Sequence, residues 1–93
     1  MFRVWGKLFK ENHLIKDITI ENPAKDMTRT AKVYAALNDI CYELDLSVPL
    51  WLDSNKKEFI LHDKTRFYQD QFIESIDFDF LEFHVIEEDH FYE

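Results

Sequence analysis

Residues 76–93, IDFDFLEFHVIEEDHFYE, contain the side chains of this chain that are best placed to do chemistry. Asp77 and Asp79 are two positions apart, and so are Glu82 and His84. On a β-strand, such a pair points from one face with Cβ atoms about 7 Å apart, close enough to share a metal ion. The four residues are therefore candidate metal ligands.

A metal site normally also takes ligands from a second element. His13 and His62 are candidates for that role, but the sequence does not place them in space. His90 cannot join His84 without an intervening turn, because six extended residues span about 20 Å. A metal-dependent, hydrolase-like site thus remains an alternative to the ordinary interpretation, in which these charged side chains are simply solvated.

Other catalytic motifs are excluded more firmly. The only glycine is Gly6, which rules out glycine-rich phosphate loops, dinucleotide fingerprints and nucleophile elbows. The only cysteine is Cys41, which rules out an internal disulfide and multi-cysteine metal motifs. Cys41 falls on the apolar stripe of a predicted helix, where a buried, unreactive thiol is expected. We predict no catalytic residue and no cofactor.

Charge is distributed unevenly along the chain. Residues 1–66 carry 11 Lys and Arg against 10 Asp and Glu, whereas residues 67–93 carry nine carboxylates and no Lys or Arg. Such an acidic segment repels polyanions. One stretch interleaves cations with aromatic rings, a pattern that can bind single strands by stacking: Lys56, Lys57, Phe59, Lys64, Arg66, Phe67 and Tyr68. Glu58 and Asp63 halve its charge, so no nucleic-acid partner is expected.

Length and composition indicate one globular domain over residues 1–93, with 46% apolar residues and a core rich in aromatic rings. Arg3, Lys7 and Lys10 interrupt the amino-terminal apolar residues, which is unlike a signal peptide. No apolar run approaches the roughly 18–20 residues of a membrane span. A single Cys fits a reducing compartment. We expect a cytoplasmic protein with no membrane partner.

The first half of the chain predicts a hairpin and a helix. Residues 2–9 and 13–21 are rich in β-branched and aromatic residues and flank a turn at Glu11-Asn12. Residues 22–26 break the second strand, because Pro23 cannot donate to a ladder. A helix is predicted over residues 27–46.

Helical periodicity over residues 27–46 defines one apolar stripe, formed by Val33, Leu37, Ile40, Cys41 and Leu44. Lys32, Asp39 and Glu43 lie off this stripe. Asp26 or Thr28 could cap the helix by accepting a backbone N–H.

Residues 47–75 carry weaker signals. Ser47-Val48-Pro49 ends the helix, since the residue before proline disfavours the α region. Trp51 and Leu52 are expected to anchor in the core, residues 53–55 to form a turn, and residues 58–62 to form a short strand.

The stretch KTRFYQDQFIES, residues 64–75, fits two periods. Tyr68, Phe72 and Ile76 at i, i+4 and i+8 favour a short helix, but a strand also fits.

Residues 76–87 are predicted to form a strand. Partway along it, the apolar residues change from even-numbered to odd-numbered positions. The apolar residues are first Ile76, Phe78 and Phe80, then Leu81, Phe83 and Val85. A β-bulge near Phe80–Leu81 would bring all six to one face. Alternatively, a second subunit covers the other face, and we predict a homodimer with the bulge as its rival.

These elements predict an α+β fold in which the hairpin and the carboxy-terminal strand form a small antiparallel or mixed sheet packed against one main helix. The favoured function is a non-enzymatic binding or regulatory protein that meets a protein partner through a sheet edge or the acidic carboxy-terminal region. The candidate partner-binding residues are Phe78, Phe80, Glu87, Glu88 and Asp89.

Four phrases of the sequence, TRTAKV, CYELDLSVPLWL, KTRFYQDQFIE and VIEED, resemble those of small uncharacterised proteins from Gram-positive, clostridial-type bacteria. The resemblance spans most of the chain. It implies a bacterial, cytoplasmic setting and carries over no activity and no functional residue.

Overall fold

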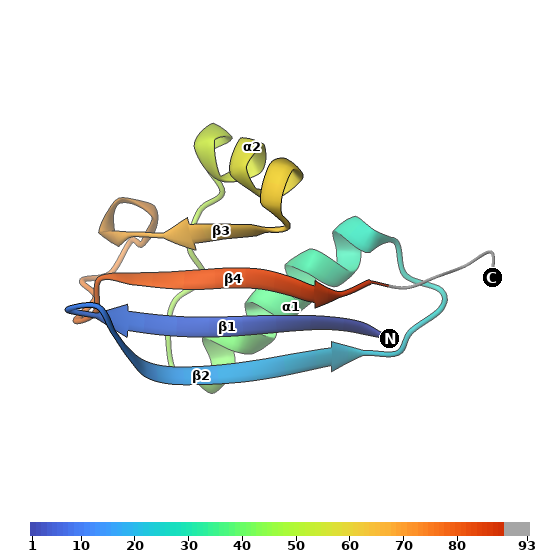
Figure 1. Ribbon diagram of the computed structural model, residues 1–93, viewed down its shortest axis with the longest axis horizontal. Helices are drawn as coiled ribbons and strands as arrows, with labels where there is room; N and C mark the ends of the chain where they lie inside the picture. The colour runs from blue at the N-terminus through green and yellow to red at the C-terminus, as the bar shows by residue number, and fades with distance from the viewer. Residues whose placement is uncertain (89–93) are drawn as a thin grey trace.

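The structure, a computed structural model, describes residues 1–88 and builds one sheet from four antiparallel strands. The elements follow the order β1 Phe2–Lys10, β2 His13–Asn22, α1 Arg29–Glu43, α2 Asp53–His62, β3 Lys64–Phe67, a 3₁₀ turn Gln69–Gln71, and β4 Phe80–Glu87. The strand order in space is β2-β1-β4-β3 (Figure 1). The predicted α+β class is confirmed, with the antiparallel form of the sheet.

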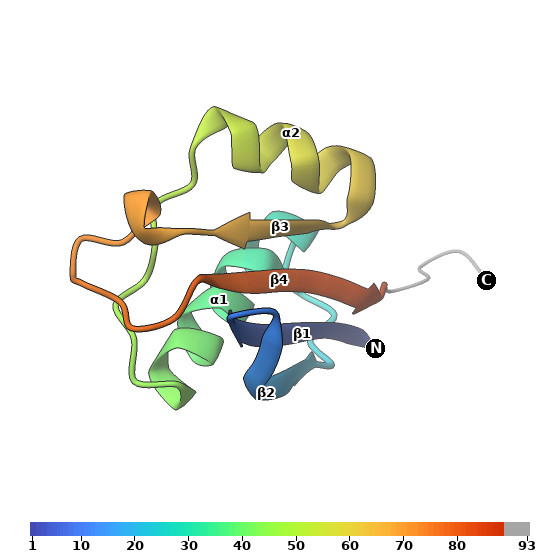
Figure 2. The ribbon, with the colours of Figure 1, turned by 60° about the vertical axis from the view of Figure 1, so that its left-hand side comes forward.

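Both helices cover the same face of the sheet. Figure 1 shows α1 behind the strands, and Figure 2 shows α2 running along β3. The even-numbered residues of β1 from Val4 to Leu8 are buried under the helices. Their partners on β4 are odd-numbered, as in Val4 with Val85 and Leu8 with Leu81, so these residues face the helices too. We call the opposite side, which faces the viewer in Figure 1, the open face. Of the helices described over residues 1–88, none is both long and apolar enough to cross a membrane.

The predicted hairpin and main helix are confirmed with small shifts in their ends. Thr28, one of the two predicted caps, accepts a hydrogen bond at Oγ1 from the backbone N–H of Ala31 (3.1 Å). The predicted stripe is buried at Val33, Leu37, Ile40 and Cys41, and Leu44 packs partly against the core. Lys32, placed off the stripe by periodicity, is instead 1% exposed, with its ammonium 6.0 Å from the centroid of the Phe2 ring.

Gly6 lies where α1 comes closest to β1. A Cβ atom at this position would be 2.7 Å from Cγ2 of Ile40, nearer than non-bonded carbon atoms pack. The absence of a side chain at residue 6 therefore lets the helix approach the centre of the sheet.

The second helix corrects two predictions. Residues 53–55, expected as a turn, begin α2, and residues 58–62, expected as a strand, complete it. Asp, Ser and Asn favour helix starts as well as turns, because their side chains bond to nearby backbone groups. Asn55 illustrates this: its Oδ1 accepts from the N–H of Leu52 (3.0 Å), while its Nδ2 donates to Oγ1 of Thr65 (2.9 Å) and ties α2 to β3.

Trp51 anchors the core as predicted, with ring centroids 5.1 Å from Phe67 and 5.5 Å from Phe59. Leu52 was expected beside it but is 43% exposed. Leu52 precedes α2 in an extended conformation, and successive side chains of an extended chain point in opposite directions.

The helix favoured for residues 64–75 is also wrong. Lys64–Phe67 is the edge strand β3, with Thr65 and Phe67 fully buried, and only the short turn Gln69–Gln71 is helical. Tyr68 directly follows the strand, and its N–H donates to Oε1 of Gln71 (2.8 Å). The helical spacing of the aromatic residues here is coincidental.

The double alternation of residues 76–87 does not come from a bulge near Phe80–Leu81. The strand β4 begins at Phe80, not at Ile76, and Phe78 reaches the core from the preceding loop. Pairing is regular where the bulge was expected, since Phe9 pairs with Phe80 as Leu8 pairs with Leu81. The register shifts instead at the other end of β4, between Val85 and Glu87.

Candidate functional site

The four candidate metal ligands do not converge. Asp79 stabilises the β1–β2 hairpin, because its Oδ2 accepts a hydrogen bond from the N–H of Glu11 (2.8 Å). Asp77 lines a separate hollow between loops, and Glu82 and His84 lie on the open face of β4. Over residues 1–88, no group of three or more His, Cys, Asp and Glu side chains could hold a metal ion. The geometry gives the metal hypothesis no support.

Glu82 is engaged by two cations. Its carboxylate lies 2.8 Å from Nζ of Lys7 on β1 and 3.2 Å from Nε of Arg66 on β3, and the residue is only 5% exposed. Burial alone would raise the pKa of Glu82, but the hydrogen bonds from Lys7 and Arg66 outweigh it and lower this pKa. Glu82 is therefore a charged member of an ion-pair row, unsuited to accept a proton at neutral pH.

His84 pairs with Trp5 on β1 and with Lys64 on β3. Its pKa is lowered by burial and by the positive charges of Lys7 and Lys64, so the imidazole is neutral at neutral pH. Its Nδ1 is buried and has no hydrogen-bond partner within the described part of the chain. His13 begins β2 and His62 ends α2, and the three described histidines are not gathered into a group that could hold a metal ion.

The candidate partner-binding residues are also dispersed. Phe78 is 6% exposed and packs edge-on against Phe72, and Phe80 stacks on Phe9 with centroids 5.1 Å apart. Glu87 pairs with Arg3 and the amino group of Met1, while Glu88 pairs with Arg29. Asp89 lies outside the described residues.

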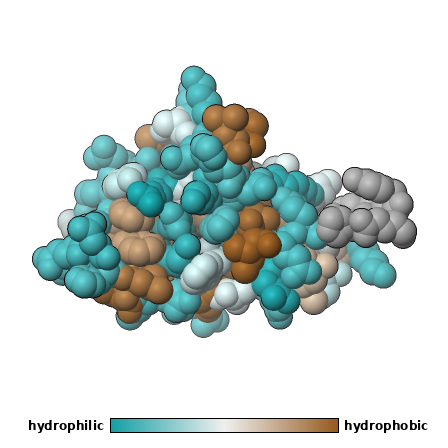
Figure 3. Space-filling model, in the orientation of Figure 1, coloured by the Kyte–Doolittle hydropathy of each residue, from teal (hydrophilic) through white to brown (hydrophobic). Residues whose placement is uncertain are grey.

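The open face combines aromatic rings with ion pairs. Nζ of Lys7 lies 3.9 Å from the centroid of Trp5, whose Nε1 donates to Asp17 (2.9 Å). The guanidinium of Arg66 lies 4.4 Å from the centroid of Phe80. Figure 3 looks onto this face and shows apolar groups toward its left, near the turn of the β1–β2 hairpin, and further apolar groups right of centre and at the top, with hydrophilic side chains between them.

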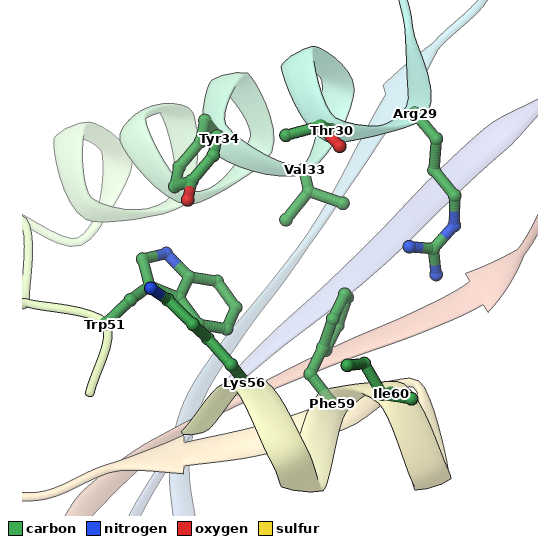
Figure 4. Close-up of a pocket in the computed structure, with 8 residues that line it drawn as sticks. All are labelled: Arg29, Thr30, Val33, Tyr34, Trp51, Lys56, Phe59 and Ile60. Atoms are coloured by element: carbon green, nitrogen blue, oxygen red, sulfur yellow. The ribbon is translucent and has the colours of Figure 1, made fainter. Parts of the chain in front are cut away.

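The other face carries a groove between α1 and α2, which we call the helix groove (Figure 4). Its volume is about 240 Å³, and it is lined by Arg29, Thr30, Val33, Tyr34, Trp51, Lys56, Phe59 and Ile60. The groove exists because the two helices cover different parts of one face, with the rings of Trp51 and Phe59 between them.

The two ends of the helix groove differ electrostatically. At one end, Arg29 is held by Glu88 (2.8 Å) and Asp63 (3.2 Å), and the hydrogen bond to Glu88 is the main cause that raises the pKa of Arg29. At the other end, Lys56 forms no ion pair with a described residue, and Figure 4 shows its side chain at the same end of the groove as Trp51. Nε1 of Trp51 is buried and has no hydrogen-bond partner within residues 1–88.

Sequence reasoning missed the helix groove because it assigned residues 58–62 to a strand. Lys56, Phe59 and Ile60 fall at i, i+3 and i+4, which is the spacing of one helical face. That spacing was the available signal for α2, but nothing in it indicates that α1 packs opposite.

Cys41 is a packing residue in the structure, with 0% exposure on the buried side of α1. Burial raises the pKa of its thiol to about 12, so the reactive thiolate is scarce at neutral pH. We expect slow labelling by a thiol-specific chromogenic reagent in the native protein and rapid labelling in urea. Equal rates in both conditions would show that the thiol is accessible and would contradict its burial.

No protein-family model matches the chain, and comparisons with curated proteins and with solved structures give no significant match.

Proposed function

We propose that this chain is a non-enzymatic protein-binding module that receives an apolar side chain of a partner protein in the helix groove. The observation that carries the proposal is Ile60, which is 81% exposed on the rim of a groove floored by Trp51 and Phe59. Its neighbour Leu61 is 76% exposed. Adjacent exposed apolar side chains beside a concave surface are typical of interaction sites.

The volume of the groove favours a protein partner over a small molecule. Sites that enclose small molecules have volumes of roughly 300–1,000 Å³ and cover most of the ligand. The helix groove, at about 240 Å³, is smaller and lies open between the helices. It has room for one or two side chains of a partner, which would act as anchor residues.

The polar groups of the groove define the partner further. Arg29 is already paired with two carboxylates and Nε1 of Trp51 is buried, which leaves Lys56 as the donor at the opposite end. A carboxylate of the partner would pair with the ammonium of Lys56. The partner segment therefore carries an aromatic or aliphatic anchor next to an acidic residue.

Replacing Ile60 with Asp should abolish or strongly weaken partner binding, because a charge at the rim would be desolvated on association. Ile73→Asp is a matched control, since Ile73 is 84% exposed and does not line the groove. Both variants and the parent protein are used to retain a partner from a native extract, and the purified partner is then titrated by calorimetry.

We expect the Ile73→Asp variant to bind like the parent and the Ile60→Asp variant to bind about 10- to 100-fold more weakly, the effect of about 1.5–3 kcal/mol for one buried aliphatic side chain. Equal binding by the two variants would exclude the helix groove as the binding surface.

A further inference from the structure

We propose that a second copy of this chain packs on the open face, so that two sheets stack face to face about a two-fold axis parallel to the strands. The inference does not depend on the helix groove, which lies on the other side of the sheet. It rests on how the open-face side chains are arranged.

Strand pairing orders these side chains in rows that cross the sheet from β3 to β2. The ionic row is Arg66, Glu82, Lys7 and Asp17. The aromatic row, toward the hairpin turn, pairs Phe80 with Phe9 and Phe9 with Leu14. Tyr68, which directly follows β3, extends this row, with its ring centroid 5.4 Å from that of Phe80.

A two-fold axis parallel to the strands keeps each row but reverses its order. In the ionic row, Arg66 then faces Asp17 of the second copy, and Glu82 faces Lys7 of the second copy. In the aromatic row, Phe80 faces Phe9 of the second copy. Each row is therefore complementary to itself, which is the requirement of an isologous interface.

The alternative axis, lying across the strands, would place β3 over β3 of the second copy. Lys64 and Arg66 of both copies would then meet, and Asp17 and Glu21 of both copies would meet on β2. Like-charge juxtaposition across an interface is strongly unfavourable. The charge pattern thus selects the axis parallel to the strands.

Covering the centre of the open face costs little further desolvation. The side chains of Lys7 and Glu82 are already only 13% and 7% exposed, and Trp5, Phe9 and Phe80 are half-buried. The strands β1, β2, β3 and β4 have 9, 10, 4 and 8 residues. With strands about 4.8 Å apart and a rise of roughly 3.3 Å per residue, the sheet presents about 500 Å² per copy. The total of about 1,000 Å² is at the lower limit of specific interfaces, so we expect a dimer that dissociates on dilution.

Light scattering coupled to size exclusion, over a dilution series from millimolar to micromolar protein, tests the dimer. The mass should fall from twice to once the chain mass of 11.3 kDa. Asp17→Arg should raise the dissociation constant about tenfold or more, because Arg66 of the second copy then faces a like charge. Lys25→Glu, a charge change in an exposed loop, should leave the constant unchanged.

Mixing two variants gives a sharper test. Asp17→Arg and Arg66→Asp should each associate poorly alone, but an equimolar mixture should recover parental association, because each of the two contacts then joins opposite charges. Circular dichroism confirms that each variant is folded. Arg66 lies beside Glu82, and Arg66→Asp could prevent folding. Asp17 lies on the exposed edge strand β2, so in that case the Asp17→Arg variant alone still decides the test.

Two results would overturn the inference: a mass of 11.3 kDa at every concentration, or a parental dimer that Asp17→Arg leaves equally tight. Ile60→Asp in the helix groove should not change the mass, so a failure here is separate from a failure of the proposed partner binding.

Discussion

Replacing Phe83 with Ala is expected to lower the free energy of unfolding by about 3–5 kcal/mol, the range for truncating a buried aromatic side chain. Phe83 is 0% exposed at the centre of β4, with ring centroids 5.9 Å from Phe59 and 6.0 Å from Trp51. Its neighbour on β1 is Gly6, which has no side chain to move into the space. The cavity would therefore stay open, and the loss should lie toward the upper end of the range.

Urea unfolding followed by circular dichroism measures this loss, and Ile86→Ala on the same strand is the control. Ile86 is 43% exposed, so its truncation should change the free energy by no more than about 0.5 kcal/mol. A loss below about 1 kcal/mol for Phe83→Ala would mean that the ring is not part of the core.

Replacing Leu37 with Ala is expected to cost about 2–5 kcal/mol, the range for a buried Leu. Leu37 is 1% exposed on the side of α1 that faces the sheet, between Val33 and Ile40. Asp39→Ala, on the exposed side of the same helix, should stay within about 0.5 kcal/mol of the parent. If Leu37→Ala and Asp39→Ala both change the free energy of unfolding in urea by the same small amount, the stripe is not part of the core.

The sequence alone was sufficient to predict an element where a single pattern indicated one structure. The apolar stripe at Val33, Leu37 and Ile40 has the period of an α-helix, and Thr28 supplies the side-chain oxygen that begins it. The hairpin was equally clear, because β-branched and aromatic residues flank Glu11 and Asn12, which both take positive φ in the turn. These two units and β4 were enough to predict the α+β class.

The sequence was insufficient where local signals support two structures. Asn55 could end a turn or begin a helix, and contacts with Thr65 and Gln71, more distant in sequence, decide for the helix. Phe78 alternates with Asp77 and Asp79 as if on a strand, yet it fills the core from a loop. Tertiary contacts override local preference at both places.

The candidate sites depend on such contacts even more. The helix groove requires Val33 and Phe59, from separate helices, to lie across from each other. The ionic row requires Lys7, Glu82 and Arg66 to meet on three strands. A single sequence shows which residues are charged or apolar, but the register that brings them together follows only from the whole sheet.

The pairing of β1 with β4 has a consequence for the synthesis of the protein. These neighbours at the centre of the sheet are the first and last of the strands described over residues 1–88, and they pair, for example, at Val4 and Val85. Until β4 leaves the ribosome, β1 has no partner strand on one of its two edges. The apolar residues between α1 and the sheet are then not yet covered by β4. Long-range pairing of this kind is also slow to form, because the intervening loop must close first. The newly made chain therefore passes through a partly assembled state that exposes apolar surface and an unpaired strand edge. In this state, binding by chaperones and cleavage by proteases compete with completion of the sheet.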